Sequence, residues 1–325
     1  MIKELLKIKR ENIMKIERIL VIGAGVNGSI CAAYLCNHGI DVTVLGRGKR
    51  LDILKRDGIV IENPFSGKRI TARVKVVDRL SPNDKYDYIL IVVRNNQIRD
   101  LLPMLDTNVS PNLVFMGNNL AGPKEITRII PKERVLMGFV FGGGKRNGDI
   151  ISGIVSSSLK TPFGEIDGQI TPRLTALVNL FNESGLKAKL SNNIVDFLST
   201  HAVGVPVVGL LTMKYKNDVK ALARSNYDMD LLARALKEAF KVLKATGHKI
   251  TPFSKGIAAK LPTFLLKLTF KLLLASKMGE VGLAWHVSQA PDEMHKLAAD
   301  LIEMVNSSKL DVPALQELLK LNTAV

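Results

Sequence analysis

The residues best suited to chemistry begin with three glycines, Gly23, Gly25 and Gly28, in the spacing GxGxxG. They follow an apolar run typical of a buried parallel strand and open a segment with helical spacing. In that setting the first glycine permits a tight turn, the second lets the backbone approach a pyrophosphate, and the third lets the helix pack closely. With Val26 and Asn27 they predict a dinucleotide-phosphate site at a helix N-terminus rather than an ordinary turn.

The loop at residues 45–50 bears on which dinucleotide is bound. It reads Leu-Gly-Arg-Gly-Lys-Arg, with no acid where NAD-dependent enzymes usually place a carboxylate on the ribose 2′-hydroxyl. A carboxylate would repel a 2′-phosphate, whereas Arg47, helped by Arg50, can contact it through paired hydrogen bonds. We therefore predict NADP(H) as the cofactor. The alternative, that these are only solvated loop cations, leaves the missing acid unexplained.

Metal and nucleophile chemistry is not indicated. The histidines have neither His-x3-His spacing nor a Cys-x2-Cys neighbour, so we predict no metal site. Cys31 and Cys36 are too few for a disulfide framework and are expected to be core thiols. The sequence contains no nucleophile elbow and no P-loop.

The elements that would position these residues alternate between strand and helix over the first part of the chain. This pattern predicts an α/β fold with a doubly wound, Rossmann-type parallel sheet, followed by an all-helical domain. We expect an N-terminal extension at 1–17, the NADP-binding domain at 18–190 and a helical substrate-binding and dimerisation domain at 191–325. The predicted strands lie at 18–22, 41–45, 59–62, 73–77, 88–93, 112–116 and 135–141. The predicted helices lie at 29–38, 97–105, 122–130, 193–211, 218–246, 262–277, 291–305 and 313–321.

Composition excludes several other classes of protein. The chain has 325 residues and a formal net charge of +16, but its basic residues are dispersed and not interleaved with aromatics, so nucleic-acid binding is not expected. No segment is predicted to span a membrane. The closest, at 261–276, is interrupted by two lysines and is expected to pack in a core or a dimer. The basic N-terminus lacks a secretion signal, and residues 1–13 fit an upstream start, so we expect a cytoplasmic protein.

Two further segments resemble the ketopantoate reductase (2-dehydropantoate 2-reductase) family, and the resemblance covers most of the chain from residue 18. Residues 89–97 match that family's strand, basic residue and glutamine, with Arg94 in place of the usual lysine and Gln97 on the glutamine. Residues 115–119 resemble its Asn-Gly turn, with Asn118 on the asparagine and Asn119 in place of the glycine. The resemblance implies that these residues position the cofactor. We expect the turn to survive because asparagine tolerates positive φ.

The helical domain departs from the family in a specific way. The resemblance places His201 on the family's catalytic lysine, while Val205 and Gly209 replace two asparagines on the same helical face. Glu293 falls on the family glutamate, which contacts cofactor ribose and substrate. The resemblance thus implies that His201 and Glu293 are the catalytic residues of a divergent member.

His201 has two interpretations. As a general acid with a pKa near the ordinary value of about 6.5, it would protonate a carbonyl oxygen at neutral pH. As a structural residue, it would be a hydrogen-bonded histidine on a buried helix face. His286 is a second polar candidate for the cleft, and Ser288 and Asn119 are further substrate-side candidates.

These features together predict an NADPH-dependent reductase of a 2-oxo acid or related ketone. The expected partners are a small carboxylate substrate and a second copy of the chain in a homodimer. The loss of the lysine and both asparagines makes ketopantoate itself an unexpected substrate. The same loss motivates a second hypothesis, in which the fold binds or senses NADP(H) without catalysis.

Overall fold

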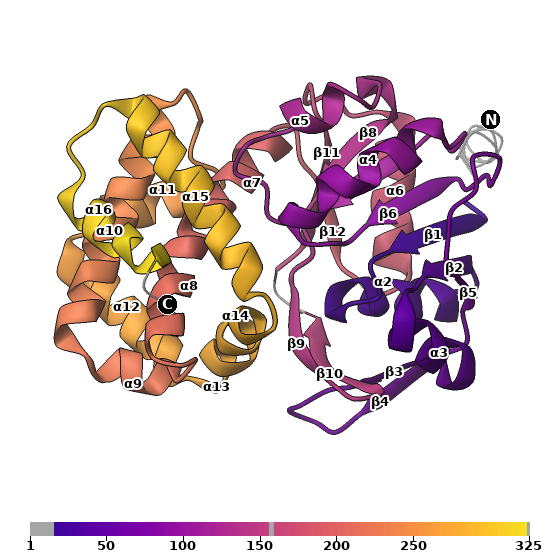
Figure 1. The fold of residues 1–325 in the computed structure, drawn as a ribbon, viewed down its shortest axis with the longest axis horizontal. Helices are drawn as coiled ribbons and strands as arrows, with labels where there is room; N and C mark the ends of the chain where they lie inside the picture. Colours follow the sequence, from indigo (N-terminus) through magenta and orange to yellow (C-terminus); the bar gives the residue numbers. More distant parts are fainter. Residues whose placement is uncertain (1–15, 156–158, 324–325) are drawn as a thin grey trace, which may run out of the picture.

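A computed structural model describes residues 16–155 and 159–323. Figure 1 shows two parts, one built on β-sheets and one made of helices, with α7 (Ile194–Ala202) passing from the first to the second. The predicted fold class, a mostly parallel α/β sheet followed by a helical region, is therefore confirmed. The extension predicted at 1–17 lies almost entirely outside the described residues.

The main sheet has eight strands in the order β12-β11-β8-β7-β6-β1-β2-β5. Six of them are parallel to one another, whereas β11 runs antiparallel to β8, and β12 runs parallel to β11. The strands are β1 (Arg18–Ile22), β2 (Asp41–Leu45), β5 (Lys75–Val77), β6 (Tyr88–Ile91), β7 (Leu113–Met116), β8 (Val135–Gly138), β11 (Thr161–Glu165) and β12 (Ala188–Leu190). The sequence predicted the six parallel strands, several of them a few residues too long, but neither β11 nor β12.

Helices cover both faces of this sheet. Alternate residues of β1 enter different cores: Ile19 and Val21 face α2 (Val26–Asn37) and α6 (Pro172–Glu183), while Leu20 and Ile22 face α4 (Ile98–Thr107) and α7. Because neither face meets water, the strands read as continuous apolar runs rather than as alternating ones. The chain reverses its strand order between β1 and β6, so their carboxyl ends form the crevice where ligands bind in such sheets.

A second, four-stranded sheet was not predicted. Its order is β4-β3-β10-β9, made of β3 (Ile59–Glu62), β4 (Arg69–Ala72), β9 (Gly142–Asn147) and β10 (Ile150–Val155). The prediction that 59–62 belongs to the main sheet is wrong, because this strand pairs with β4 and β10 instead. All four strands contact α2, and β9 also contacts the helical part.

The helical part has a core centred on α10 (Asn226–Ala245), which contacts α8 (Gly204–Lys214), α12 (Thr263–Ala275), α15 (Pro291–Ser308) and α16 (Pro313–Leu319). The helix predicted at 218–246 is two helices, α9 (Val219–Arg224) and α10. Asp218 and Ser225 accept hydrogen bonds from the backbone N–H groups that open them, so each starts a helix of its own. The shorter elements here are α11 (Phe253–Lys260), α13 (Lys277–Gly279), η3 (Glu280–Ala284) and α14 (Trp285–Gln289).

Two apolar segments bear on membrane contact. Ile194–Lys214, covering α7 and α8, is long and apolar enough to cross a membrane, contrary to the sequence-based expectation that no segment is. However, 72% of its most apolar window is buried inside the protein, as in the core helix of a soluble protein, so this is weak evidence of a span. On α12, by contrast, Phe264, Leu268 and Leu272 form an exposed row.

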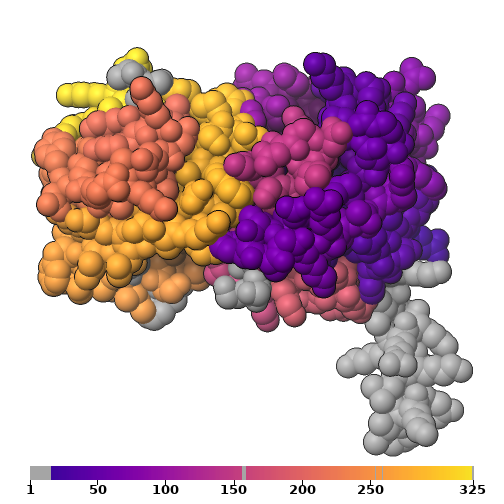
Figure 2. Space-filling model, turned by 90° about the horizontal axis from the view of Figure 1, so that it is seen from below, coloured from indigo at the N-terminus to yellow at the C-terminus, as the bar shows by residue number. Residues whose placement is uncertain are grey.

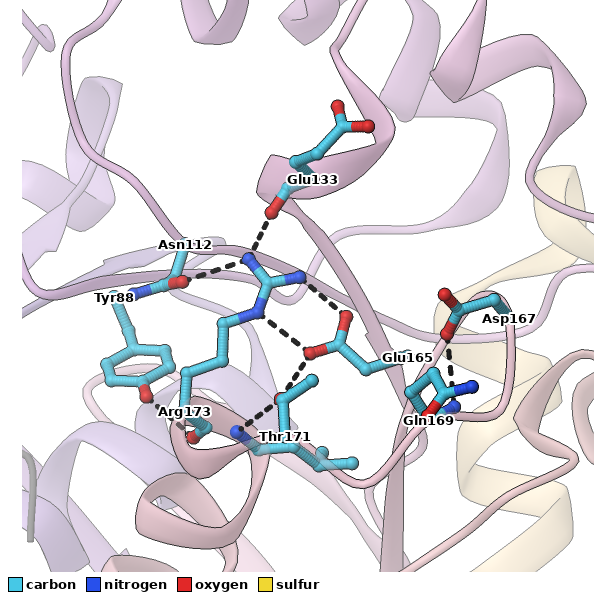
Figure 3. Close-up of polar contacts among 9 residues, drawn as sticks. Tyr88, Asn112, Glu133, Glu165, Asp167, Gln169, Thr171 and Arg173 are labelled. Carbon is cyan, nitrogen blue, oxygen red and sulfur yellow. Dashed lines mark hydrogen bonds and ion pairs between the residues drawn. The ribbon is translucent and has the colours of Figure 1, made fainter.

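A buried polar cluster fixes α6 against the sheet (Figure 3). The guanidinium of Arg173 contacts both oxygens of Glu165 at 2.5 and 2.8 Å and also donates to Asn112 and to the backbone carbonyl of Glu133. Tyr88 donates to the carbonyl of Arg173. Asn112 and Tyr88 lie at the amino ends of β7 and β6, opposite the glycine turn, so this cluster is structural.

Candidate active site

The glycine turn follows β1 and cannot carry side chains at two of its three positions. Gly23 has φ +110°, and a Cβ there would lie 2.2 Å from the carbonyl oxygen of Val92. A Cβ on Gly28 would lie 1.9 Å from the carbonyl oxygen of Gly23. A Cβ on Gly25 would meet nothing within 4 Å, so the protein leaves open space at the position where the motif admits a phosphate group.

Arg47 and Arg50 occupy different environments after β2. Arg47 is exposed and precedes the first turn of α3 (Gly48–Asp57). Arg50 is buried, and its guanidinium donates to the carbonyl of Ala24 and the hydroxyl of Ser29 at 3.2 Å each, inside the glycine turn. Burial, and then the nearby cation Arg146, lower its pKa. Arg50 therefore braces the turn, and Arg146 on β9 adds a cation that sequence reasoning did not single out.

Buried polar atoms without a protein partner gather along the same edge of the sheet. Within the described residues they include Asn27 Oδ1, Arg50 Nη1, Asn118 Oδ1 and Asn119 Oδ1. Buried polar atoms are normally hydrogen-bonded, so four such atoms, in the first turns of α2 and α3 and in the loop after β7, indicate a polar ligand. Together with the glycine turn, they fit a dinucleotide cofactor.

Arg94 and Gln97 follow β6, where Arg94 connects the two parts of the protein. Its guanidinium pairs at 2.6 Å with Asp292, in the first turn of α15, and donates to the carbonyl of Gln289, at the end of α14. Gln97 accepts from the backbone N–H of Arg94 at 3.2 Å. Burial alone would raise the pKa of Asp292, but hydrogen bonds from Asn96 and Arg94 outweigh it and lower that pKa.

Asn118, Glu293 and His286 come together across the boundary between the two parts. Asn118, after β7, donates to Glu293 Oε1 at 3.1 Å, and both side chains are buried. The other carboxylate oxygen of Glu293 lies 3.4 Å from His286 Nε2. Neither Asn118 nor Asn119 adopts positive φ, so the conformational expectation for this turn is wrong; Gly122 adopts it instead.

The environment of His201, at the end of α7, contradicts one expectation. Its ring lies 4.2 Å from that of Phe139, and Lys255 Nζ lies 3.4 Å from its Nδ1. Burial, then the charges of Lys255 and His286, hold the pKa of His201 well below 6.5. An acid with an ordinary imidazole pKa is therefore the wrong description, because this ring is neutral at neutral pH.

The positions around His201 show how the departures from the family are accommodated. A Cβ on Gly209 would lie 2.5 Å from the sulfur of Met294, so the Met294 side chain occupies this space and would have to move for a side chain here. Val205 packs against the helical core. Ser288 is exposed and donates to the carbonyl of Trp285, which keeps it within its own helix turn.

The two parts of the molecule are in direct contact around these residues. Figure 2 shows the orange and yellow helical part packed against the indigo-to-pink sheet part. On β9, Gly143 approaches the backbone of Gly282, and the ammonium of Lys145 lies 4.4 Å from the ring centre of Trp285. No group of three or more His, Cys, Asp or Glu side chains that could hold a metal occurs in the part of the chain that the structure describes.

Comparison with known proteins agrees with this geometry. Residues 19–168 match the family model described as Ketopantoate reductase PanE/ApbA. Over these residues, which are just under half of the chain, it is similar to the ketopantoate reductase family. The chain is a 2-dehydropantoate 2-reductase-like oxidoreductase.

Similar proteins extend the match over most of the chain. The 2-dehydropantoate 2-reductase of Pyrococcus horikoshii is 24% identical over 239 residues, 71% of this chain and 75% of the relative. The 2-dehydropantoate 2-reductase of Methylococcus capsulatus superposes with a TM-score of 0.69, 20% identity and coverage of 94% and 96%. D-mandelate dehydrogenase, solved with NADH and anilino(oxo)acetate, superposes with a TM-score of 0.76, 16% identity and coverage of 94% and 97%. At these identities the superpositions establish the fold.

Three residues of the site escaped sequence analysis: Lys255, Asp292 and Arg146. Asp292 stands beside Glu293, and an acid in the first turn of a helix was a weak signal for it. Lys255 and Arg146 are ordinary basic residues in the sequence, and only tertiary packing places them beside His201 and Arg50.

Proposed function

We propose that this protein is an NADPH-dependent reductase of an apolar 2-oxo acid, which it converts to the 2-hydroxy acid. The observation that carries the proposal is the buried contact of Asn118 with Glu293. This contact connects the loop after β7, beside the proposed dinucleotide site, with α15, which carries the carboxylate of Glu293. The same carboxylate also contacts His286. A polar cluster of this kind at the mouth of the nucleotide crevice suits a ketone and the cofactor ribose.

The cofactor would be held by residues on three strand ends. Gly23, Gly25, Val26, Asn27 and Gly28 would hold the pyrophosphate at the N-terminus of α2. Arg47 would contact the 2′-phosphate from its exposed position, and Arg50 would support the turn while presenting its unpartnered Nη1. Asn118 would face the nicotinamide end, and the cofactor, once bound, supplies the hydride.

The side chains near His201 favour an apolar substrate. Phe139, Phe141 and Phe197 form a cluster with ring centres 5.1 to 6.5 Å apart, and the imidazole of His201 packs against Phe139. The positions that carry asparagines in the family offer only Val205 and a backbone at Gly209. A substrate hydroxyl placed against the rings of Phe139, Phe141 and Phe197 would be buried without a hydrogen-bond partner, at a cost of about 1–3 kcal/mol. An aromatic or branched-alkyl 2-oxo acid avoids that cost.

The first test is a panel of 2-oxo acids with aryl, branched-alkyl and hydroxyalkyl side chains, monitored by NADPH consumption. We expect turnover, with the aryl and branched-alkyl acids preferred. Binding of NADPH without turnover of any acid would favour the non-catalytic hypothesis. The proposal includes a cytoplasmic homodimer, for which the exposed row on α12 is the natural place of contact.

A further inference from the structure

One basic side chain in the site has no role in the function proposed so far. Lys255, on α11, places its Nζ 3.4 Å from His201 Nδ1, although the two residues lie 54 positions apart. Both side chains are partly buried. No carboxylate pairs with Lys255 within the described residues, so the ammonium is held beside an imidazole rather than in an ordinary ion pair.

The loop before α11 fixes this arrangement by attaching α11 to α7. Asp196 accepts from the backbone N–H of Lys249 at 3.2 Å and lies 3.3 Å from the imidazole of His248. One turn later, Thr200 donates to the carbonyl of Lys249 and accepts from the backbone N–H of Thr251 at 3.1 Å. His201 follows Thr200 directly, so the same hydrogen bonds hold Lys255 beside the Nδ1 atom of the ring.

Electrostatics then determine where the protons lie. An ammonium has no lone pair, so a hydrogen bond between the two groups requires Lys255 to donate to an unprotonated Nδ1. The neutral ring must then carry its proton on Nε2. Burial lowers the pKa of Lys255 to about 8, and burial with the charges of Lys255 and His286 lowers the pKa of His201. At neutral pH the pair therefore consists of a charged lysine and a neutral histidine.

We propose that Lys255 is the source of the proton for carbonyl reduction and that His201 relays it. The inference rests on the proposed function. As hydride adds to the carbonyl carbon, the Nε2–H of His201 passes its proton to the carbonyl oxygen, and Nδ1 takes a proton from the ammonium of Lys255. The products are the hydroxyl group, a neutral imidazole of the opposite tautomer and a neutral amine, which regains a proton from water. Lys255 on α11 thus supplies the proton that the family's lysine would supply from the position of His201 on α7.

The titratable groups of this pair and those that face it come from four helices. They are His201 on α7, Lys255 on α11 and His286 on α14, with Glu293 of α15 behind His286. Asp196 faces His248 and the loop backbone instead. The pH dependence of reduction should therefore follow Lys255, which loses its proton at a higher pH than the ring.

The kinetic test uses the intact enzyme with NADPH and the best oxo acid from the panel. Reduction measured as kcat/KM should be level below pH 8 and fall tenfold per unit above it, while the reverse oxidation rises toward the same pH. Lys255→Met should lower reduction about 10²- to 10⁴-fold and remove this inflection. Lys255→Arg should keep more activity than Lys255→Met and move the fall to higher pH, because a guanidinium holds its proton. Lys260→Met, at the exposed end of α11, is the matched control and should match the native enzyme.

A second readout needs no turnover and no cofactor. Nitrogen NMR of the imidazoles should show the Nε2–H tautomer for His201, and carbon-labelled methylation of the lysines should show one amine titrating near pH 8. Lys255→Met should abolish that amine signal and raise the pKa of His201, because a neighbouring cation is gone. An ordinary lysine pKa at position 255, or full activity with an unchanged pH profile in Lys255→Met, would overturn the relay alone. Absence of turnover in the native enzyme would overturn the proposed function and the relay with it.

Discussion

At the scale of single residues, the glycines of the turn have two different roles. Gly28 is required by steric packing, whereas Gly25 leaves room for a ligand. A Cβ at position 28 would collide with the carbonyl oxygen of Gly23, whereas one at position 25 would meet nothing in the protein. We expect Gly28→Ala to lower both the melting temperature and NADPH affinity. Gly25→Ala should leave the melting temperature unchanged and weaken NADPH binding at least about tenfold, or 1.4 kcal/mol. Calorimetric titration and thermal unfolding of both variants would test this, and full NADPH affinity in Gly25→Ala would contradict it.

The charge of Arg47 gives a second prediction at this scale. We expect NADPH to bind at least about tenfold more tightly than NADH at low salt, because a charge-assisted phosphate contact is worth 1.4 kcal/mol or more. Arg47→Asp should reduce or reverse that preference. Lys55→Asp makes the same charge change near the other end of α3, at an exposed site, and should leave the preference intact. Equal affinities of the native protein for the two cofactors would count against the assignment.

Residue-level chemistry was only partly predictable from the sequence. The glycine motif could be identified because its spacing depends directly on backbone conformation. The absence of an acid at 45–50 could be used because the charge of that loop can be read from its residue types. The state of His201 could not be identified, because its pKa depends on burial and on Lys255, and neither is visible from neighbours in the chain.

At the scale of elements, the predictable strands were those buried on both faces of the main sheet. The second sheet escaped because β9 begins with three consecutive glycines and β4 is short, with one buried residue. The strand at 59–62 (β3) was predicted, but it was assigned to the main sheet. The two strands at one edge of the main sheet, β11 and β12, escaped because β11 opens with Thr-Pro and contains a glycine.

The buried cluster of Arg173 and Glu165 supplies a prediction at this scale. Removal of one partner of a buried ion pair leaves an uncompensated charge, so Arg173→Met should lower the free energy of unfolding by about 3–5 kcal/mol. Arg99→Met removes an exposed pair with Glu125 and should cost about 1 kcal/mol or less. Denaturant unfolding of the two variants would provide the comparison. Similar losses for both would show that the cluster does not clamp α6 to the sheet.

At the scale of the whole molecule, contacts distant in sequence assemble the site. Arg94 with Asp292 and Asn118 with Glu293 both join residues more than 170 positions apart, and β9 adds contacts to η3 and α14. Resemblance to a family predicted Glu293, Asn118 and Arg94 as site residues, but it gave no signal that Arg94 pairs with the acid beside Glu293. The substrate-facing surface was the least predictable part, because it depends on how α7, α11 and α14 pack around one histidine.

The most direct test of this account compares two substrates in the native enzyme with saturating NADPH. One is ketopantoate, whose hydroxyl would be buried without a partner against the rings of Phe139, Phe141 and Phe197, and the other is an aryl 2-oxo acid. We predict the larger kcat/KM for the aryl acid, and a value for ketopantoate below about 10⁴ M⁻¹s⁻¹, the lower end of the usual range for enzymes. A kcat/KM for ketopantoate at or above that value, and higher than that of the aryl acid, would contradict the account.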